Sequence, residues 1–311
     1  MGGDARHWRR GRPTVMLGSS RFWGTMNVND GPWWAAGSDS PKHADYARYL
    51  DKLGPTPRTP HAIKVLSATP KFTLDSLTAA AYDPWIPLFA DQLSELVAAH
   101  GRSPNASREE AVALLAAWDH RWSLTSTETS LAVFWADALW ERVATAAGMP
   151  LAPVQHALMA QASDTEKLAS LDAAIARLKA DFGSWRVPWG EINRFQRLDG
   201  AIVRTFDDAK PSIPVPFVSA NWGSLAAFGA QRYPGTRRYY GDYGNSFVAV
   251  VEFGPRVRAR AVMAGGLSSD PASPHFNDQA PRYAQGNLRE VHFYPEDLAG
   301  KTRSLKVVRG E

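Results

Sequence analysis

Two neighbouring runs of β-branched and aromatic residues constrain the fold of this chain more than any other feature. The first run covers residues 247–253, the second covers residues 256–263, and Gly254-Pro255 separates them. A turn at residues 241–246 precedes the first run, and a polar loop rich in Gly, Ser and Pro follows the second as far as Gln279. Runs of this composition, bounded by turn residues, predict two adjacent β-strands.

The middle of the chain, residues 72–183, shows helical spacing instead. Apolar residues recur at i, i+3, i+4, i+7 and i+8 from Leu131 to Leu139, which places them on one helix face. Asp164 stands where an N-cap belongs, and a second apolar stripe follows it as far as Phe182. Further amphipathic helices are predicted at residues 88–99 and 109–118.

These patterns divide the chain into three segments. Residues 1–63 are predicted to form loops with short strands, for example at residues 14–17, and residues 64–183 form a helical segment. Residues 184–311 are predicted to be rich in strands. This order indicates an α/β chain of the α+β type and favours one interleaved domain over two independent ones.

Composition excludes several classes of function. The chain has no cysteine, so a cysteine nucleophile, disulfides and thiolate metal sites are excluded. No run of about 18 apolar residues is present, and the first residues lack the apolar core of a signal peptide. The net charge of +4 is modest, and we interpret the arginines near the N-terminus as a solvated end. We therefore predict no membrane span and no nucleic-acid partner.

The order of the two strand runs, closed by Ser-Pro-His-x-x-Asp-Gln at residues 273–279, resembles the C-terminal part of the penicillin amidase family. Trp-Gly-Glu at residues 189–191 adds to the resemblance. The family contains penicillin acylases, acyl-homoserine-lactone acylases and aculeacin-type acylases, all of them N-terminal-nucleophile amidohydrolases. The resemblance implies a four-layer αββα sandwich, of which this chain would be a later part with a helical middle segment.

A second point of resemblance is Asn29-Asp30-Gly31-Pro32. In the family, a segment of this kind supplies a side-chain amide to the oxyanion hole, and Asn29 is the matching residue. Amide hydrolysis passes through a tetrahedral oxyanion, which a fixed N–H donor stabilises more than it stabilises the ground-state carbonyl. The same tetrapeptide also favours a turn, and the two interpretations are compatible.

Arg58 follows Asn29 by 29 residues, among prolines that restrict the backbone. The family resemblance implies an arginine that positions groups around the nucleophile, whereas the alternative is an exposed loop arginine. Both interpretations stay open.

Other candidate sites are weaker. We reject a hydrolytic triad drawn from the polar loop, because the matching family segment is structural; its members would be Ser268, Ser269, His275 and Asp278. Leu267 departs from the polar residue expected at its position. The histidines lack ligand spacing, so no cofactor is predicted. Family resemblance leaves a calcium ion possible near Asp39 or Asp45, without a commitment to it.

The family's chemistry requires a serine, threonine or cysteine as the first residue of a chain freed by self-cleavage. This sequence begins Met1-Gly2-Gly3, so we expect the nucleophile segment and the small subunit to lie upstream and to be its partners. The resemblance thus implies a fragment of an amidohydrolase that cleaves N-acyl substrates such as acyl-homoserine lactones, penicillins or lipopeptides through an acyl-enzyme. It also implies a periplasmic or secreted location and an isolated chain that is inactive. The alternative is a non-catalytic binding or assembly protein that retains the scaffold.

Overall fold

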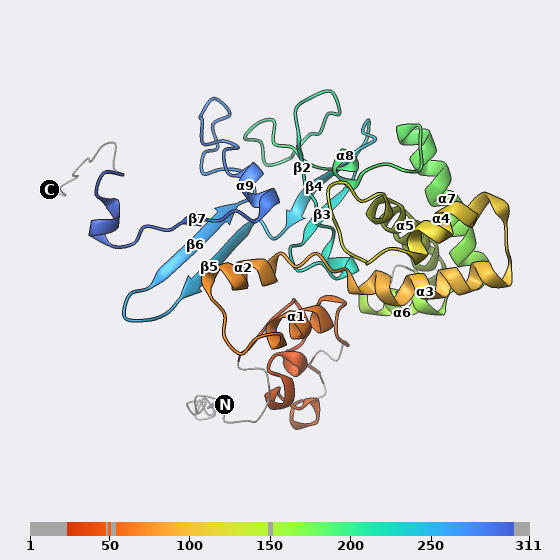
Figure 1. Cartoon of the computed structure of the whole chain (residues 1–311), viewed down its shortest axis with the longest axis horizontal. Coiled ribbons are helices and arrows are strands. Elements are labelled where there is room, and N and C mark those ends of the chain that lie inside the picture. Colours follow the sequence, from red (N-terminus) through yellow and green to blue (C-terminus); the bar gives the residue numbers. More distant parts are fainter. Residues whose placement is uncertain (1–23, 48, 51–53, 149–151, 302–311) are drawn as a thin grey trace, which may run out of the picture.

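The structure is a computed structural model that describes residues 24–47, 49–50, 54–148 and 152–301 (Figure 1). The strand predicted at residues 14–17 lies outside these residues. Figure 1 shows a group of helices at one end of the molecule, sheets in the middle and a long two-stranded ribbon at the other end. The segment that carries Asn29 lies beside helix α1, below the sheets in this view.

Five helices form the helical end, and all but α6 correspond to helices predicted from apolar patterns in the sequence. They are α3 (Pro87–Arg102), α4 (Ala106–Ala116), α5 (Thr127–Ala147), α6 (Ala152–Gln161) and α7 (Asp164–Phe182). Leu131, Trp135 and Leu139 of the predicted stripe are fully buried. They pack with Leu171 and Leu178 of the second stripe in one apolar cluster, so the predicted helix faces are confirmed.

The sequence pattern predicted Asp164 as the N-cap of α7, and this is wrong: the N-cap is Ser163. The Ser163 hydroxyl accepts a hydrogen bond from the Glu166 backbone N–H, while the Glu166 carboxylate accepts one from the Ser163 N–H. This reciprocal capping box satisfies two backbone groups that a cap at Asp164 would leave unpaired. Asp164 becomes the first helical residue, where its charge still complements the helix dipole.

The strands form two sheets. The first has the order β2-β1-β4-β3 and contains β1 (Asn193–Phe195), β2 (Ile213–Pro214), β3 (Phe228–Arg232) and β4 (Tyr239–Gly244). The second has the order β5-β6-β7 and contains β5 (Phe247–Glu252), β6 (Arg258–Met263) and β7 (Arg289–Glu290). The two strands predicted from residues 247–263 are therefore confirmed, as an antiparallel pair in which Val250 faces Arg260 across the ladder.

The segment before residue 64 differs from its prediction. Its described residues contain short 3-10 helices at Pro32–Trp34, Gly37–Asp39 and His43–Asp45, followed by α1 (Arg58–Ser67). No strand is found in the described part of this segment, so the prediction of short strands is wrong there. Prolines and glycines keep these helices short. The segment therefore lacks apolar periodicity, and its sequence pattern is typical of loops.

Shorter elements complete the chain: α2 (Leu74–Ala81), α8 (Trp189–Ile192), η5 (Ala220–Trp222), α9 (Ala280–Gln285) and η6 (Pro295–Leu298). The mixture of helices and largely antiparallel sheets agrees with the predicted α+β class, and the four-layer sandwich stays a prediction. Among the described helices, none has the length and apolar character needed to cross a lipid bilayer.

Candidate functional site

Asn29 occupies a sharp bend just before the first 3-10 helix. Its φ of 63° lies in the left-handed region, which asparagine tolerates better than most residues because its short side chain bonds locally. The Asn29 backbone N–H donates to the Asn27 side-chain oxygen at 3.0 Å. The neighbouring Val28 side chain is buried, and Asn29 itself is exposed. The bend thus directs the side chain at position 29 outward from a fixed backbone.

Arg58 contacts this bend, although 29 positions of sequence separate it from Asn29. It is the first residue of α1, and its Nη2 atom donates to Asn29 Oδ1 at 2.9 Å and to the Val28 carbonyl oxygen. The structure therefore brings together the two residues that the sequence singled out. The arginine is partly buried, which differs from the interpretation of it as an exposed loop residue.

A second pair of residues ties the same two segments together. The Thr59 hydroxyl donates to the Asp30 carboxylate and also accepts from the Thr56 backbone N–H at 3.0 Å. Thr59 is almost fully buried. Neither Asp30 nor Thr59 was predicted to have a role. No sequence signal marked this pair, because the spacing of 29 residues that it shares with Asn29 and Arg58 follows from the two pairs being neighbours in the sequence.

Helix α1 is fixed to the rest of the protein by a buried histidine. His61 Nδ1 lies 2.8 Å from the Gly223 carbonyl oxygen, and Nε2 lies 3.1 Å from Asp83 Oδ1. Gly223 has a φ of 99°, and a Cβ atom there would lie 2.6 Å from a side-chain carbon of Pro87. Only glycine allows this close approach, which sets the end of η5 against the start of α3, while the His61 contact holds α1 at the same place.

The arrangement leaves one side-chain donor of Asn29 available. Arg58 occupies the amide oxygen, and among the described residues the amide nitrogen has no hydrogen-bond acceptor. Since Arg58 donates to the oxygen, it also fixes which end of the amide is the donor. Burial lowers the pKa of Arg58 below its ordinary value and the charge of Asp30 opposes this shift, so the side chain stays cationic. The site therefore presents an oriented N–H group beside a positive charge.

The polar loop after β6 behaves as a local structure. His275 Nδ1 lies 2.9 Å from Asp278 Oδ2, while the Ser268 hydroxyl accepts from the Asp270 backbone N–H. Leu267 is 65% exposed. Serines contact His275 only through its backbone: its N–H donates to the Ser273 hydroxyl and its carbonyl oxygen accepts from the Ser268 N–H. Among the described residues no serine hydroxyl is bonded to the imidazole ring, in accord with our rejection of a triad.

The carboxylates considered for calcium do not form a cluster of ligands. Asp39 and Asp45 end two different 3-10 helices and are exposed. Among the described residues, no group of three or more histidine, aspartate or glutamate side chains is placed to hold a metal ion. Calcium in proteins takes six to eight oxygen ligands, so these residues alone do not fit the ion.

Comparison with known proteins places the chain in a family. The sequence model of the penicillin amidase family matches residues 12–300. The chain belongs to the penicillin amidase family, as the sequence resemblance predicted.

A solved structure of the thermostable penicillin G acylase from Alcaligenes faecalis is similar to this chain, with 15% sequence identity and a TM-score of 0.45. The similarity covers 86% of this chain and 53% of the acylase chain, so our chain spans about half the length of that protein.

Proposed function

We propose that this chain supplies the oxyanion-stabilising part of an acylase that hydrolyses the amide bond of N-acyl substrates. The observation that carries the proposal is the Asn29 side chain, whose oxygen is held by Arg58 and whose exposed nitrogen has no acceptor among the described residues. An oxyanion hole requires a donor that is fixed before the charge develops. Membership of the penicillin amidase family supports this assignment of the donor.

In the proposed reaction, a terminal serine on a separate segment of polypeptide attacks the substrate carbonyl. The serine gives its proton to its own α-amine and forms a C–O bond, and the carbonyl oxygen becomes an oxyanion bonded to Asn29 Nδ2. Collapse of this intermediate breaks the C–N bond and leaves an acyl-enzyme, and the departing amine takes the proton from the α-ammonium group. Water then attacks the ester through a second oxyanion and releases the acid. Arg58 keeps the amide in place in both steps.

The segment that carries the nucleophile is also the proposed partner of this chain. Arg58 Nε is buried and has no hydrogen-bond partner among the described residues, so a donor beside Asn29 is left for a group supplied by the partner. Acyl-homoserine lactones, penicillins and lipopeptides are the proposed substrates, and the proposed location is periplasmic or secreted.

The test is a substitution at position 29 in the complete precursor, expressed together with its nucleophile segment. We expect Asn29→Ala to lower kcat by about 10²–10³-fold. Asn29→Asp should cost at least as much, because it replaces the donor with a negative charge of the same shape. Hydrolysis of phenylacetylated and long-chain acylated amides would be followed in parallel.

Asn287→Ala is the matched control, since Asn287 is an exposed asparagine in a different part of the chain. Its kcat should stay within about twofold of the parent value. A kcat for Asn29→Ala that equals the control value would remove Asn29 from the mechanism. Turnover by the purified 311-residue chain alone, lost on substitution of one of its own serines, would overturn the division of roles.

A further inference from the structure

A cavity of about 510 Å³ lies between the helical end of the molecule and the first sheet. Helices α5 and α7 form one wall, and η5, β3 and β4 form the other, in the region where Figure 1 shows the helices meeting the sheet. None of the residues assigned to the oxyanion site lines it. Aromatic side chains form a third of its wall, and they come from Phe134, Trp140, Trp189, Trp222, Phe228, Tyr239 and Tyr243. Its size is that of a small-molecule site.

Two carboxyl groups of α5 interrupt this aromatic wall. Asp137 and Glu141 are one helical turn apart, so they share a face, and both line the cavity. The Tyr239 hydroxyl lies 3.3 Å from Asp137 Oδ2. Burial, with the like charge of Glu141, raises the pKa of Asp137 to about 7, against which the Tyr239 hydrogen bond acts weakly. An acidic group is thus held in a poorly solvated place without a compensating cation.

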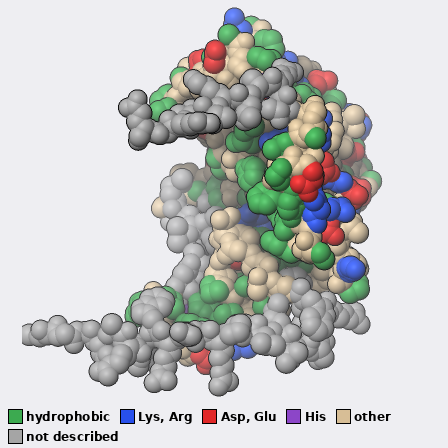
Figure 2. Space-filling view, turned by 90° about the vertical axis from the view of Figure 1, so that its left-hand side faces the viewer, with side chains coloured by type: hydrophobic (Ala, Val, Ile, Leu, Met, Phe, Trp, Pro, Cys, Tyr) green, Lys and Arg blue, Asp and Glu red, His purple; other side chains and the backbone are tan. Residues whose placement is uncertain are grey.

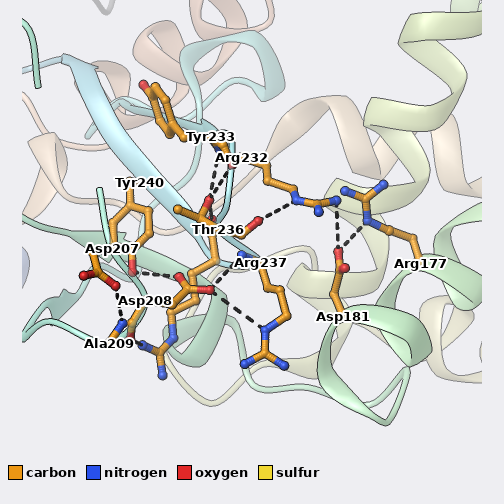
Figure 3. Close-up of polar contacts among 11 residues, drawn as sticks. Arg177, Asp181, Asp207, Asp208, Ala209, Arg232, Tyr233, Thr236, Arg237 and Tyr240 are labelled. Carbon is orange, nitrogen blue, oxygen red and sulfur yellow. Dashed lines mark hydrogen bonds and ion pairs between the residues drawn. The ribbon is translucent and has the colours of Figure 1, made fainter. Parts of the chain in front are cut away.

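The arginines of the cavity do not serve as that cation. Arg177 and Arg232 both reach Asp181, a largely buried carboxylate outside the cavity wall, as Figure 3 shows. Arg232 also donates through Nε to the Thr236 carbonyl oxygen at 2.6 Å. Neither arginine contributes to the pKa of Asp137. The two guanidinium groups therefore sit at the partly exposed edge of the cavity with partners of their own.

Two further polar atoms of the lining residues are buried without partners. The Asn193 side chain is fully buried, and its Nδ2 donates to the Val215 and Phe217 carbonyl oxygens at 2.8 and 3.0 Å. Its Oδ1 has no partner among the described residues, and neither has the indole N–H of Trp189. A buried polar group without a hydrogen bond costs roughly 1–3 kcal/mol. Residues of the cavity wall thus hold one buried acceptor and one buried donor without partners among the described residues.

We propose that this cavity binds a small organic ammonium ion that carries an apolar or aromatic body and a hydroxyl or carbonyl oxygen. The ammonium group would lie between the Asp137 carboxylate and the aromatic rings, which attract cations through their faces. Its N–H groups suit an acceptor such as Asn193 Oδ1, and its oxygen suits a donor such as the Trp189 indole. An anionic ligand would meet Asp137 and Glu141 with the wrong sign. This inference does not depend on the proposed hydrolytic activity.

The test compares three probes that share a phenyl ring and differ in charge: protonated phenylalaninol, phenylpropanol and phenylpropionate. Calorimetric titration of the full chain should show phenylalaninol binding about tenfold more tightly than phenylpropanol, and phenylpropionate most weakly. Binding should also shift the indole N–H resonance of Trp189 in proton–nitrogen NMR spectra. Equal affinity for the three probes, tighter binding of phenylpropionate, or no binding at all would overturn the proposal.

Substitutions in the cavity test where the ammonium group of the ligand binds. Asp137→Asn should lower the phenylalaninol affinity about tenfold and leave that of phenylpropanol unchanged, while Glu141→Gln at the exposed edge should cost about twofold to threefold. Asp172→Asn, on α7 and outside the cavity wall, removes the same charge and should change neither affinity. Unchanged phenylalaninol affinity in Asp137→Asn contradicts the proposal. If that variant does not fold, the Glu141→Gln titration and the Trp189 resonance of the parent protein decide.

Discussion

At the residue scale, Asn29 satisfies two demands that rarely coincide. Its backbone is in the left-handed region, where asparagine is one of the few side chains tolerated at modest cost. Its side chain is held by Arg58 through the oxygen and is otherwise unpaired among the described residues. A glycine would satisfy the backbone and lose the donor, whereas a glutamine would keep a donor and strain the bend. Strained backbone and an oriented polar group are together typical of a functional position.

Asp137 supports a prediction about pH and stability. The pKa of an aspartate is ordinarily 3.8, and in the folded chain it is raised to about 7. Between these values the folded state holds a proton that the unfolded state has lost, so this residue's contribution to the free energy of unfolding falls as pH rises from about 4 to about 7. The upper limit of the fall is ~4 kcal/mol, from ~1.4 kcal/mol per pKa unit. Glu141, Tyr239 and Tyr243 face the group, and Arg177 and Arg232 are occupied by Asp181.

Denaturant titrations of Asp137→Asn and the parent chain check this. The variant should be the more stable of the two at pH 8, and its advantage should shrink between pH 7 and pH 5, because the amide cannot ionise. A difference in unfolding free energy that is constant across this range would show that the carboxyl group is ordinarily solvated. Substituting Asp172 in the same way, on the exposed surface of α7, should produce no such pH-dependent difference.

At the element scale, the sequence predicted best where burial repeats along the chain. The stripe from Leu131 to Leu139 and the run at residues 247–253 gave the correct element types because apolar spacing follows directly from helix and strand geometry. Helix α1 was missed because Pro57 and Pro60 flank its first turn, and proline is tolerated there although it suggests a loop. Contacts between distant segments, such as Thr59 with Asp30, leave no periodic trace.

The cavity, too, could be predicted only in part from the sequence. The apolar stripe of α5 was visible in the sequence, yet Asp137 was not singled out. A carboxylate at i+3 from Phe134 and i−4 from Glu141, beside an otherwise apolar face, is an available signal. Whether such a residue faces solvent or a cavity depends on β4 and η5, which the local pattern does not place.

The cap of α7 gives a prediction that belongs to the element. Ser163→Ala removes the hydroxyl that accepts from the Glu166 N–H and should lower the free energy of unfolding by ~1 kcal/mol. Ser163→Asp keeps an acceptor at the cap and should restore most of the loss, which chemical denaturation will measure. Asp164→Ala tests the alternative cap, and Arg102→Ala measures separately the ion pair that Asp164 forms with Arg102. A loss at Asp164 that exceeds both the ion-pair loss and the loss at Ser163 would mean that Asp164 is the cap.

At the scale of the whole molecule, β5 is covered on one face only. Val250 is buried against the second apolar cluster, while Phe247 and Val251 on the other face are 59% and 41% exposed, and Phe253 beyond the strand is 84% exposed. Figure 2 views this end of the molecule and shows hydrophobic side chains gathered beside charged ones. In the described chain β5 pairs only with β6, so its other edge is unpaired. Strands with continuous apolar runs are ordinarily covered on both faces.

We therefore predict that β5 is where the proposed partner segment packs, and that the chain without a partner self-associates there. An apolar edge strand with unpaired backbone groups is a template for pairing with a second chain. The double variant Phe247→Lys, Val251→Lys should shift sedimentation profiles of the isolated chain toward monomer and reduce binding of a hydrophobic dye. In the complete precursor it should reduce assembly with the nucleophile segment, because two charges would then enter a buried layer.

Ile202→Lys is the matched control, since Ile202 is 99% exposed and lies outside both sheets. An equal effect of the control would assign the association to general surface hydrophobicity, and a monomeric parent chain would show that the uncovered face is stable without a partner.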